Sequence, residues 1–377
     1  MTMARPAETG LANSRRLVIK IGSVLLVEQE TGAIRRDWLD ALCDDVLDLR
    51  ARGTEVVLVS SGAIAVGRRL LGIEHDALML EEKQASAATG QIRLAHAWQD
   101  ALARHDMTVA QVLLTLSDTE ERRRHLNARN TIETLLRLGA VPVINENDTV
   151  ATEEIRFGDN DRLAARVAQM ISADTLILLS DIDGLYSNDP RGNDAAEFVS
   201  EVREITPEIT AMAGEAPPGY SSGGMVTKLD AARIALGAGC AMAIADGKRL
   251  RPIKAIMDGA RCTWFPSTAQ PRAARKNWIA GSVSPSGQIT IDDGAARALS
   301  GGKSLLPAGV TAVNGAFQRG DLVIIQDRAG RAVGRGLTAY SADDARRIIG
   351  HKSREIEALL GYRGRDEMIH RDDLVLD

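Results

Sequence analysis

The sequence predicts an α/β protein, in which a mainly parallel sheet is sandwiched by helices and a small β-rich domain follows. Apolar runs of strand length alternate with helical patterns, which is typical of a parallel sheet covered on both faces. A stretch rich in Pro, Gly, Ser and basic residues then precedes several short strands. We therefore expect an α/β domain over residues 15–265, a linker over 266–286 and a β-rich domain over 287–377.

The composition of the 377 residues is that of a globular protein, with 45% hydrophobic and 26% charged residues. A net charge of -5 and only 3% aromatic residues argue against a protein devoted to nucleic acid. Cys43, Cys240 and Cys262 are widely spaced, which suits a reduced cytoplasm and indicates neither a disulfide framework nor a zinc site. No apolar run reaches the roughly 18 residues of a membrane helix. Residues 1–14 lack the apolar region of a signal peptide and are expected to form a loose tail.

Hydrophobic periodicity predicts the individual elements. Residues 38–49 carry apolar side chains at helical spacing, and Gly53 follows as a helix C-cap. Ser117 to Glu120 has the pattern of a capping box, which opens a polar helix. In the first domain we predict strands at 16–21, 55–62, 107–115, 141–145, 173–180, 240–245 and 261–265, and helices at 38–49, 63–71, 83–105, 117–138, 162–171 and 225–236. In the second domain we predict strands at 288–291, 309–313 and 321–326, and a helix over 341–360 interrupted at Gly350.

The first domain is organised around one stretch, in which the apolar strand 141–145 ends in amide and carboxylate side chains. A second acidic cluster, Asp159 to Asp161, opens the next helix. Open α/β sheets bind ligands at the carboxyl ends of their strands. The side chains that we therefore expect at a ligand-binding edge of the sheet are Asn145, Asp148, Asn160 and Asp161.

Three other segments are candidates for anion binding, and each has a structural alternative. Lys20 lies near the carboxyl end of the apolar strand 16–21, which Gly22 follows, so it contacts a phosphate or is a solvent-exposed edge lysine. The segment 60–62 (Ser-Ser-Gly), between a strand and a helix, is a backbone anion site or an ordinary turn. The segment 221–228, a glycine pair that opens a helix, suits a polyphosphate or is a flexible loop before a capped helix. We interpret the basic run 122–124 as a solvated helix face rather than a subunit or ligand contact.

Several common catalytic motifs are missing from the sequence. Gly302-Lys303-Ser304 mimics the end of a Walker A loop, but Arg297 stands where that motif needs its first glycine. No strand-linked GxGxxG, no kinase HRD or DFG set and no Ser-His-Asp order is recognisable. After these motifs are excluded, the candidate functional features are two lysines, Lys20 and Lys228, several carboxylates and the glycine-rich turns. Phosphoryl transfer requires this combination of groups. An acceptor that is itself a carboxylate needs no general base, which fits the lack of a suitably placed histidine.

Several segments, occurring together in one order, resemble the amino acid kinase superfamily and, within it, the bacterial glutamate 5-kinases. These segments are Val18–Ser23, Val59–Gly67, Leu126–Arg129, Pro142–Asp148, Phe157–Asp161, Gly184–Tyr186 and Gly223–Lys228. The second domain resembles a PUA domain through Gly336–Ser341, Arg347–Gly350, Glu355–Tyr362 and His370–Asp373. The resemblance covers residues 15–375 and implies the amino acid kinase fold followed by a PUA domain.

The resemblance implies the ATP-dependent phosphorylation of the γ-carboxylate of L-glutamate to L-glutamate 5-phosphate, the first step of proline biosynthesis. It assigns catalysis to Lys20 and Lys228, with Asp161 orienting both lysines. It places L-glutamate on Ser61, Asp148, Asn160 and Asn145. It implies backbone donors to the phosphoryl group at Gly22 and Gly62. It implies ATP contacts by Lys20, Gly22, Ser180, Asp181, Ser222, Gly223, Gly224, Met225, Val226, Thr227 and Lys228.

The resemblance also implies a cofactor and partners. Mg2+ is expected to be carried mainly by ATP, since no protein cage for the ion is evident. L-proline is expected as a feedback inhibitor at the glutamate pocket, and the chain is expected to form a homo-oligomer, either a dimer or a tetramer. PUA domains often bind RNA, but residues 287–377 carry thirteen Lys and Arg against thirteen Asp and Glu. RNA affinity depends strongly on positive charge, so we expect a regulatory or assembly role for this domain.

Departures from the family pattern are few. Ser60 and Ser180 stand where threonine is common, which keeps the hydroxyl group. Ile182-Asp183 replaces a common Gln-Lys pair and leaves the adenine or ribose contacts there open. One alternative function is that of a related kinase acting on N-acetylglutamate, aspartate, carbamate or a nucleoside monophosphate. The Asn-Glu-Asn-Asp motif and the PUA domain argue against this alternative. The other alternative is an RNA-binding protein.

Overall fold

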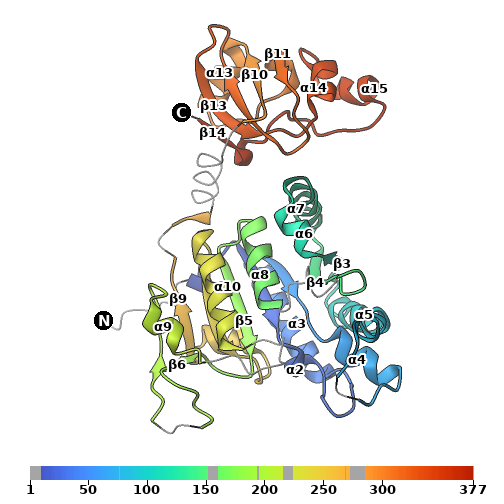
Figure 1. Ribbon diagram of the computed structural model, residues 1–377, viewed down its shortest axis with the longest axis vertical. Helices are drawn as coiled ribbons and strands as arrows, with labels where there is room; N and C mark the ends of the chain where they lie inside the picture. Colours follow the sequence, from blue (N-terminus) through green and yellow to red (C-terminus); the bar gives the residue numbers. More distant parts are fainter. Residues whose placement is uncertain are drawn as a thin grey trace. The chain divides into compact units, whose positions relative to one another are not determined.

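The computed structural model describes residues 10–75, 77–151, 160–192, 195–214, 224–267, 269–271 and 285–376. The chain divides into two compact units, Met1–Pro271 and Arg272–Asp377. The first is a mixed α/β unit and the second is rich in β-strands (Figure 1), as the sequence predicts. The bounds of the linker stay a prediction, because residues 272–284 lie outside the described part of the chain.

The first unit is built on a seven-stranded sheet with the strand order β3-β4-β2-β1-β5-β8-β9. The strands are β1 (Arg16–Ile21), β2 (Glu55–Val59), β3 (Val109–Leu114), β4 (Val141–Glu146), β5 (Thr175–Ser180), β8 (Ala241–Asp246) and β9 (Cys262–Phe265). Neighbouring strands pair in parallel, except that β9 runs antiparallel to β8. The seven predicted strands are therefore confirmed, and the carboxyl ends of the parallel ones share one edge.

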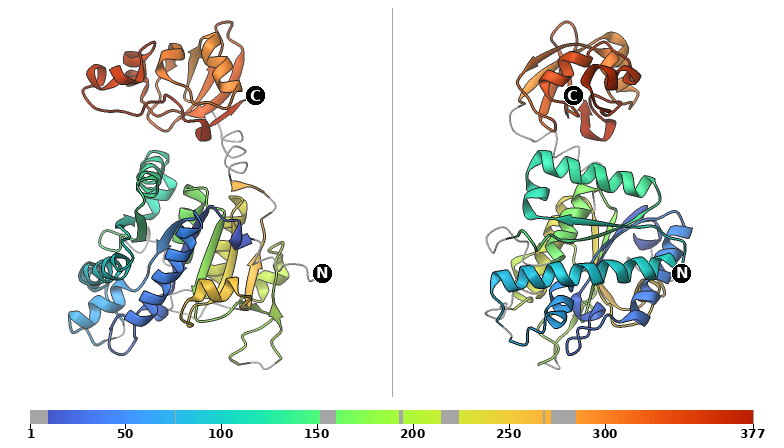
Figure 2. Two further views of the ribbon diagram at one scale, coloured as in Figure 1. Left: turned by 180° about the vertical axis from the view of Figure 1, so that it is seen from behind. Right: turned by 90° about the vertical axis from the view of Figure 1, so that its right-hand side faces the viewer.

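Helices cover both faces of this sheet (Figures 1 and 2). Helices α3, α5 and α11 share a buried cluster with Leu17, Ile19 and Ile21 of β1. Helices α7, α8 and α10 share the opposite cluster with Val18. Because successive strand residues point to opposite faces, Lys20 lies on the face of α8 and α10. The helices of the unit are α2 (Ser23–Leu26), α3 (Arg36–Ala51), α4 (Ala63–Leu70), α5 (Leu80–Ala103), α6 (Leu116–Glu120), α7 (Arg122–Arg137), α8 (Asn160–Met170), α9 (Pro207–Ala211), α10 (Met225–Gly237) and α11 (Pro252–Met257), and its short strands are β6 (Leu185–Tyr186) and β7 (Phe198–Val199).

Helices α4 and α5 cross at two glycines that leave no room for a side chain. A Cβ atom at Gly67 would lie 1.8 Å from the carbonyl oxygen of Ser86, and one at Gly90 would lie 1.8 Å from that of Ala63. Both contacts are with backbone, which cannot move aside as the end of a flexible side chain can. The crossing therefore fixes α5 against α4, the helix that follows the turn at residues 60–62.

Gly90→Ala is expected to lower the free energy of unfolding by roughly 1–3 kcal/mol, because overpacking forces the two backbones apart. Thermal unfolding followed by circular dichroism measures the change. Gly237→Ala in α10 is the matched control, since a Cβ atom there meets nothing within 4 Å and alanine favours a helix. Equal stability of the two variants would contradict the close crossing.

The predicted single helix over 117–138 is wrong, because the chain forms two helices there, α6 and α7. Thr115, rather than Ser117, is the N-cap, and its N–H and hydroxyl both donate to Asp118 Oδ2 at 2.7 Å. Glu121 then leaves helical geometry, with a ψ of 117°. The capping box is therefore present, but it begins at the last residue of the predicted strand 107–115.

The expectation of a loose tail is also wrong for the described part of residues 1–14. Leu11 is only 1% exposed and joins the core cluster of α3 and α5. The Ser14 and Thr175 hydroxyl oxygens lie 2.7 Å apart. Residues 10–14 are thus packed on the α/β unit.

The second unit holds a five-stranded sheet with the order β11-β10-β12-β13-β14. The three predicted strands are present, and the predicted helix over 341–360 is divided by Gly350, which has a φ of +77°. The strands are β10 (Gly287–Ile291), β11 (Val310–Gly315), β12 (Leu322–Gln326), β13 (Ala332–Leu337) and β14 (Leu374–Leu376). The helical segments are α13 (Asp293–Ser300), η1 (Pro307–Gly309), α14 (Ala342–Ile348), η2 (Ser353–Glu355), α15 (Ile356–Leu360) and η3 (Arg371–Asp373). Among the described helices of both units, none has the length and apolar character needed to cross a membrane.

Candidate active site

The three residues predicted to be catalytic form one buried ion triad. The Lys20 ammonium lies 2.5 Å from Asp161 Oδ1, and the Lys228 ammonium donates to Asp161 Oδ2 at 2.9 Å. Asp161 is 0% exposed, and the two lysines are 6% and 4% exposed. The alternative that Lys20 is a solvent-exposed edge lysine is therefore wrong. One carboxylate holds an ammonium group on each of its two oxygens.

The triad forms where three elements of one face converge. Lys20 is the last residue but one of β1, a central strand of the sheet. Asp161 is the second residue of α8, and Lys228 stands in the first turn of α10. A carboxylate at a helix N-terminus is also favoured by the helix dipole. The strand period and two helix starts thus place these side chains together, although they are far apart in the sequence.

The electrostatics of the triad keep Asp161 ionised. Burial alone would raise the pKa of the Asp161 carboxyl group, but the ammonium groups of Lys20 and Lys228 lower this pKa to about 2. The triad then carries two positive charges and one negative charge in a water-poor site. Interactions with charge are stronger in such surroundings than in water. The site is therefore suited to the oxygens of a phosphoryl group in transfer.

A second cluster joins the ends of β2 and β4 to the start of α8. Asn160 Nδ2 lies 2.8 Å from the Ser60 carbonyl oxygen, 2.8 Å from Ser61 Oγ and 2.9 Å from Asn145 Oδ1. Asn145 Nδ2 donates to Gln91 Oε1 at 2.8 Å. The structure thus brings together Ser61, Asn145 and Asn160, three of the four residues predicted to bind the acceptor.

Two further predicted residues flank this cluster. Asp148 is half-buried in the turn after β4, three residues beyond Asn145. Gly62 is the N-cap of α4 with a φ of +101°, and a Cβ atom there would lie 2.9 Å from Val27 Cγ2. Only glycine fits this turn without strain.

Some of the residues predicted to contact the nucleotide lie at the carboxyl ends of β1 and β5. The Ser180 hydroxyl donates to Asp181 Oδ1 at 3.2 Å. The N–H of Gly22 donates to the Leu179 carbonyl oxygen at 3.3 Å, so this expected phosphoryl donor already has a partner in the sheet. A Cβ atom at Gly22 would meet only that same oxygen, at 3.5 Å. The position is therefore open to a ligand even though its N–H is engaged.

The remaining predicted nucleotide residues lie at the start of α10. Gly224 is the N-cap, and Met225, Val226, Thr227 and Lys228 form the first turn. The Thr227 hydroxyl donates to the Gly224 carbonyl oxygen at 2.8 Å and lies 3.4 Å from Asp161 Oδ2. Ser222 and Gly223 lie outside the described residues.

Three side chains of α5 were not predicted from the sequence, namely Gln84, Gln91 and Trp98. Each contacts a segment of the candidate site. The signal that could have found them is their regular seven-residue spacing in an otherwise alanine-rich helix.

A kinase reaction with ATP generally needs a divalent cation. In the described part of the chain, no three His, Cys, Asp or Glu side chains are grouped so that they could hold a metal ion. The most buried carboxylate of the site, Asp161, is taken by two lysines. The binding of this cation by the phosphates of the nucleotide stays a prediction.

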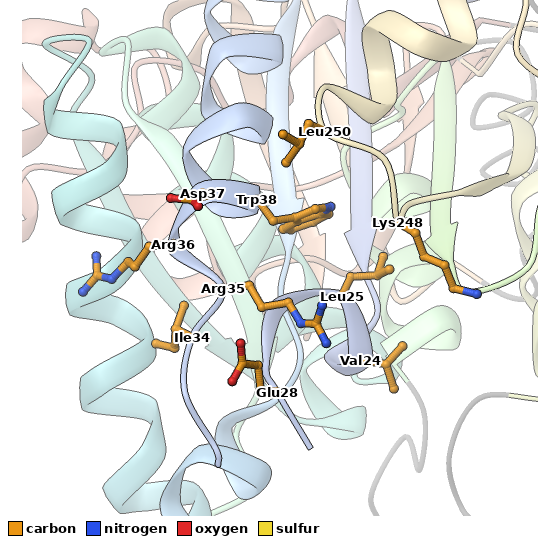
Figure 3. A pocket seen from close by; sticks show the side chains of 10 residues that line it. All are labelled: Val24, Leu25, Glu28, Ile34, Arg35, Arg36, Asp37, Trp38, Lys248 and Leu250. Atoms are coloured by element: carbon orange, nitrogen blue, oxygen red, sulfur yellow. The ribbon is translucent and has the colours of Figure 1, made fainter. Parts of the chain in front are cut away.

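A separate groove of about 470 Å³ lies beside α2 and the start of α3 (Figure 3). Within it the Trp38 indole N–H donates to the Gly247 carbonyl oxygen at 2.6 Å. None of the described residues that line the groove is a predicted site residue, so it is not the candidate active site. It is lined by Val24, Leu25, Glu28, Ile34, Arg35, Arg36, Asp37, Trp38, Lys248 and Leu250.

Comparison with known proteins shows the same two-part organisation. Residues 15–246 match the amino acid kinase family, and residues 287–360 match the PUA domain. The crystal structure of UMP kinase from Ureaplasma parvum shares the fold, with a TM-score of 0.50, 14% identity and coverage of 68% of this chain and 100% of that one. The fold and the site therefore define an amino acid kinase with an appended PUA domain.

Two curated relatives narrow this class. The glutamate 5-kinase of Paramagnetospirillum magneticum is 66% identical over 97% of this chain and 99% of its own length. The glutamate 5-kinase of Agrobacterium fabrum is 60% identical over 97% of this chain and 94% of its own length. The chain belongs to the glutamate 5-kinase family, which confirms the resemblance seen in its motifs.

Proposed function

We propose that this protein transfers the γ-phosphoryl group of ATP to the γ-carboxylate of L-glutamate, which gives L-glutamate 5-phosphate in the first step of proline biosynthesis. The observation that carries the proposal is the buried triad, in which Asp161 holds Lys20 and Lys228 side by side. Relatives named glutamate 5-kinase, at 66% and 60% identity, support the choice of acceptor.

In the proposed mechanism, a γ-carboxylate oxygen of glutamate attacks the γ-phosphorus while the bond to the bridging oxygen breaks and ADP leaves. The acceptor is already ionised at neutral pH, so no side chain has to remove a proton. Lys20 and Lys228 stabilise the charge on the transferring oxygens. Asp161 holds both ammonium groups in place beforehand, so that the site does not reorganise during the reaction.

The amide cluster is proposed to bind the amino acid. The Ser61 hydroxyl group suits a substrate carboxylate, as does an amide N–H, and the carboxylate of Asp148 suits the substrate ammonium group. Asn145 and Asn160 complete this set. The ring of contacts around Asn160 Nδ2 supports a shared role for these residues.

The start of α10 is proposed to bind the polyphosphate of ATP. Gly224 has no side chain to cap the helix, so the N–H groups of the first turn suit phosphate oxygens. Ser180, Asp181, Ser222 and Gly223 are assigned to the nucleotide from the resemblance. Mg2+ carried by the phosphates supplies further neutralisation of their charge.

ADP release by the purified protein with Mg2+ and ATP tests the function. L-glutamate is compared with N-acetylglutamate, L-aspartate, UMP and no acceptor, each with and without L-proline. We expect turnover with L-glutamate only. Turnover with another acceptor alone would keep the role of the triad but overturn the proposed amino acid site.

We further propose that L-proline inhibits the enzyme by competing at the glutamate pocket, where Asp148 contacts the ammonium group of either amino acid. Asp148→Asn is therefore expected to raise the KM for glutamate and the inhibition constant for proline by about tenfold each, since a charge-assisted hydrogen bond is lost. Initial rates measure both constants, with Asp258→Asn, which changes an exposed carboxylate at the end of α11, as the control. If neither constant changes, Asp148 does not contact the two amino acids.

Three other parts of the proposal concern the protein outside its active site. Family resemblance supports a dimer or tetramer, which sedimentation measures. Three buried cysteines without disulfides suit the cytoplasm. A regulatory or assembly role for the PUA domain follows from its balanced charge, and a salt-dependent gel shift with structured RNA would reveal a binding role instead.

A further inference from the structure

Three side chains of α5 reach the segments at the ends of β2 and β4, which carry the proposed glutamate-binding residues Ser61, Asn145 and Asp148. Seven residues make nearly two helical turns, so positions 84, 91 and 98 lie on one face of the helix. The contacts are Gln84 Nε2 to the Ala151 carbonyl oxygen at 3.2 Å, Asn145 Nδ2 to Gln91 Oε1 at 2.8 Å, and Trp98 Nε1 to Ser60 Oγ at 3.0 Å. A helix without any recognised motif therefore supports the ends of β2 and β4.

Backbone groups fix the direction of the hydrogen bonds in this cluster. The Ser60 carbonyl group can only accept, so it faces the amino group of Asn160. The Glu146 N–H can only donate, at 2.9 Å, so it faces Asn145 Oδ1. The amino group of Asn145 must then face Gln91 Oε1, which accepts its hydrogen bond. Gln91 thus secures the end of a chain of amides that begins at Asn160.

This polarity determines what the cluster offers to a ligand. The three contacts that Asn160 makes with described residues all share the two hydrogens of Nδ2, which leaves Oδ1 to accept from an ammonium group. Ser61 Oγ accepts from Asn160, so its own proton is left to donate to a carboxylate. A hydrogen-bond acceptor for an ammonium group thus lies beside a hydrogen-bond donor for a carboxylate. This pair matches the two charged groups of a free α-amino acid.

We propose that Gln91 is a positioning residue for the amino acid substrate, and that it acts by holding the amide of Asn145 and, through it, that of Asn160. This role rests on the proposed function of the site. Gln91 directly follows Gly90, where α5 touches the backbone of α4. The base of the Gln91 side chain is therefore held at a fixed distance from the turn that carries Ser61.

Packing alone does not require an amide at position 91. The core-facing neighbours Leu94 and Ala97 are 0% exposed and apolar, whereas Gln91 is half-buried. Methionine has nearly the same length and volume as glutamine, but its sulfur is a weak acceptor. Gln91→Met therefore removes the hydrogen bond to Asn145 and leaves the volume of the side chain almost unchanged.

The test is steady-state kinetics of the full-length enzyme with ATP and L-glutamate. Gln91→Met is expected to raise the KM for glutamate about tenfold, because Asn145 loses its acceptor and reorients. The KM for ATP and the melting temperature are expected to stay unchanged. Gln99→Met is the matched control, since Gln99 is exposed on the same helix, and it is expected to behave as the wild type.

A double-mutant cycle shows whether Gln91 acts through Asn145. If it does, Gln91→Met combined with Asn145→Ala raises the KM for glutamate no further than Asn145→Ala alone. Additive effects, an unchanged KM for glutamate, or equal rises in both KM values with a lower melting temperature would each overturn the proposal.

A second variant covers the case in which Gln91→Met does not fold. Gln91→Glu keeps an oxygen acceptor towards Asn145, so its KM for glutamate is expected to stay below that of Asn145→Ala. A KM equal to or above that value would overturn the positioning role. Wild-type enzyme without glutamate-dependent turnover would instead refute the proposed function, and with it this role. A failure of the inference is thus distinguishable from a failure of the function.

Discussion

Lys20→Ala and Lys228→Ala are each expected to lower kcat by about 10²–10³-fold, because each removes one positive charge from the oxygens of the transferring phosphoryl group. The two ammonium groups lie on different oxygens of the same buried carboxylate, so each occupies its own place in the site. ADP release at saturating ATP and L-glutamate measures kcat directly.

The matched control for both variants is Lys248→Ala. Lys248 is an exposed lysine in the loop after β8, and it lines the groove beside α2, whose lining contains none of the predicted site residues. Its kcat is expected to equal that of the wild type. Near-normal turnover of Lys20→Ala or Lys228→Ala would remove that lysine from the catalytic residues.

Asp161→Asn is expected to reduce both turnover and stability. An asparagine cannot neutralise the two buried ammonium groups, and breaking a buried ion pair typically costs about 3–5 kcal/mol of unfolding free energy. We expect kcat to fall by about 10²-fold or more, because the lysines lose the group that orients them. Urea unfolding measures the stability. Asp258→Asn, which removes a carboxylate with 61% exposure, is expected to change stability by less than about 1 kcal/mol.

Acidification provides an independent test of the same carboxylate. The pKa of Asp161 in the folded protein is about 2, below its usual value. Its contribution to stability is therefore fully present above about pH 4 and is lost as the pH falls through about 2. The difference in unfolding free energy between the wild type and Asp161→Asn should shrink across this range. A difference that does not depend on pH would mean that Asp161 is not ionised in the folded protein.

Local patterns in the sequence were sufficient to predict the sheet of the α/β unit and the edge on which the site lies. Apolar runs that end in polar residues identify strand ends, and glycine-rich segments before helices identify the turns. They do not determine which strand lies at the centre. The position of β1 between β2 and β5 is set by the tertiary structure. This position buries Lys20 and distinguishes a triad residue from a surface lysine.

The contacts of Asn145 were not predictable from the sequence for a different reason. The seven-residue spacing of Gln84, Gln91 and Trp98 identifies one face of a helix, but it does not identify the segments that this face contacts. The partner of Gln91 stands at the end of another element, and the contact depends on how closely α5 approaches the sheet. The close packing of α5 on α4 is set by Gly67 and Gly90 together, and neither glycine alone reveals it.

Strand β13 was not predicted from the sequence, because it contains two glycines. Gly334 and Gly336 lower the expected strand propensity. A Cβ atom at Gly334 would lie 2.2 Å from the Val375 carbonyl oxygen, and one at Gly336 would lie 2.9 Å from that of Asp373. The close approach of β14 thus requires glycine at positions 334 and 336, although glycine at these positions lowers the strand propensity of the sequence.

In a survey of all single substitutions, Gly67 and Gly90 would rank among the least tolerant positions of the chain, although neither is a predicted ligand contact. A growth selection that reports only loss of function would place them beside Asp161. A parallel measurement of the abundance of folded protein separates loss of folding from loss of activity. Variants of the two glycines are expected to lose folded protein and activity together. Conservative changes such as Gln91→Met are expected to lose activity per folded molecule. A mutational scan of this enzyme family that does not also measure the abundance of each variant would therefore assign too many residues to the active site.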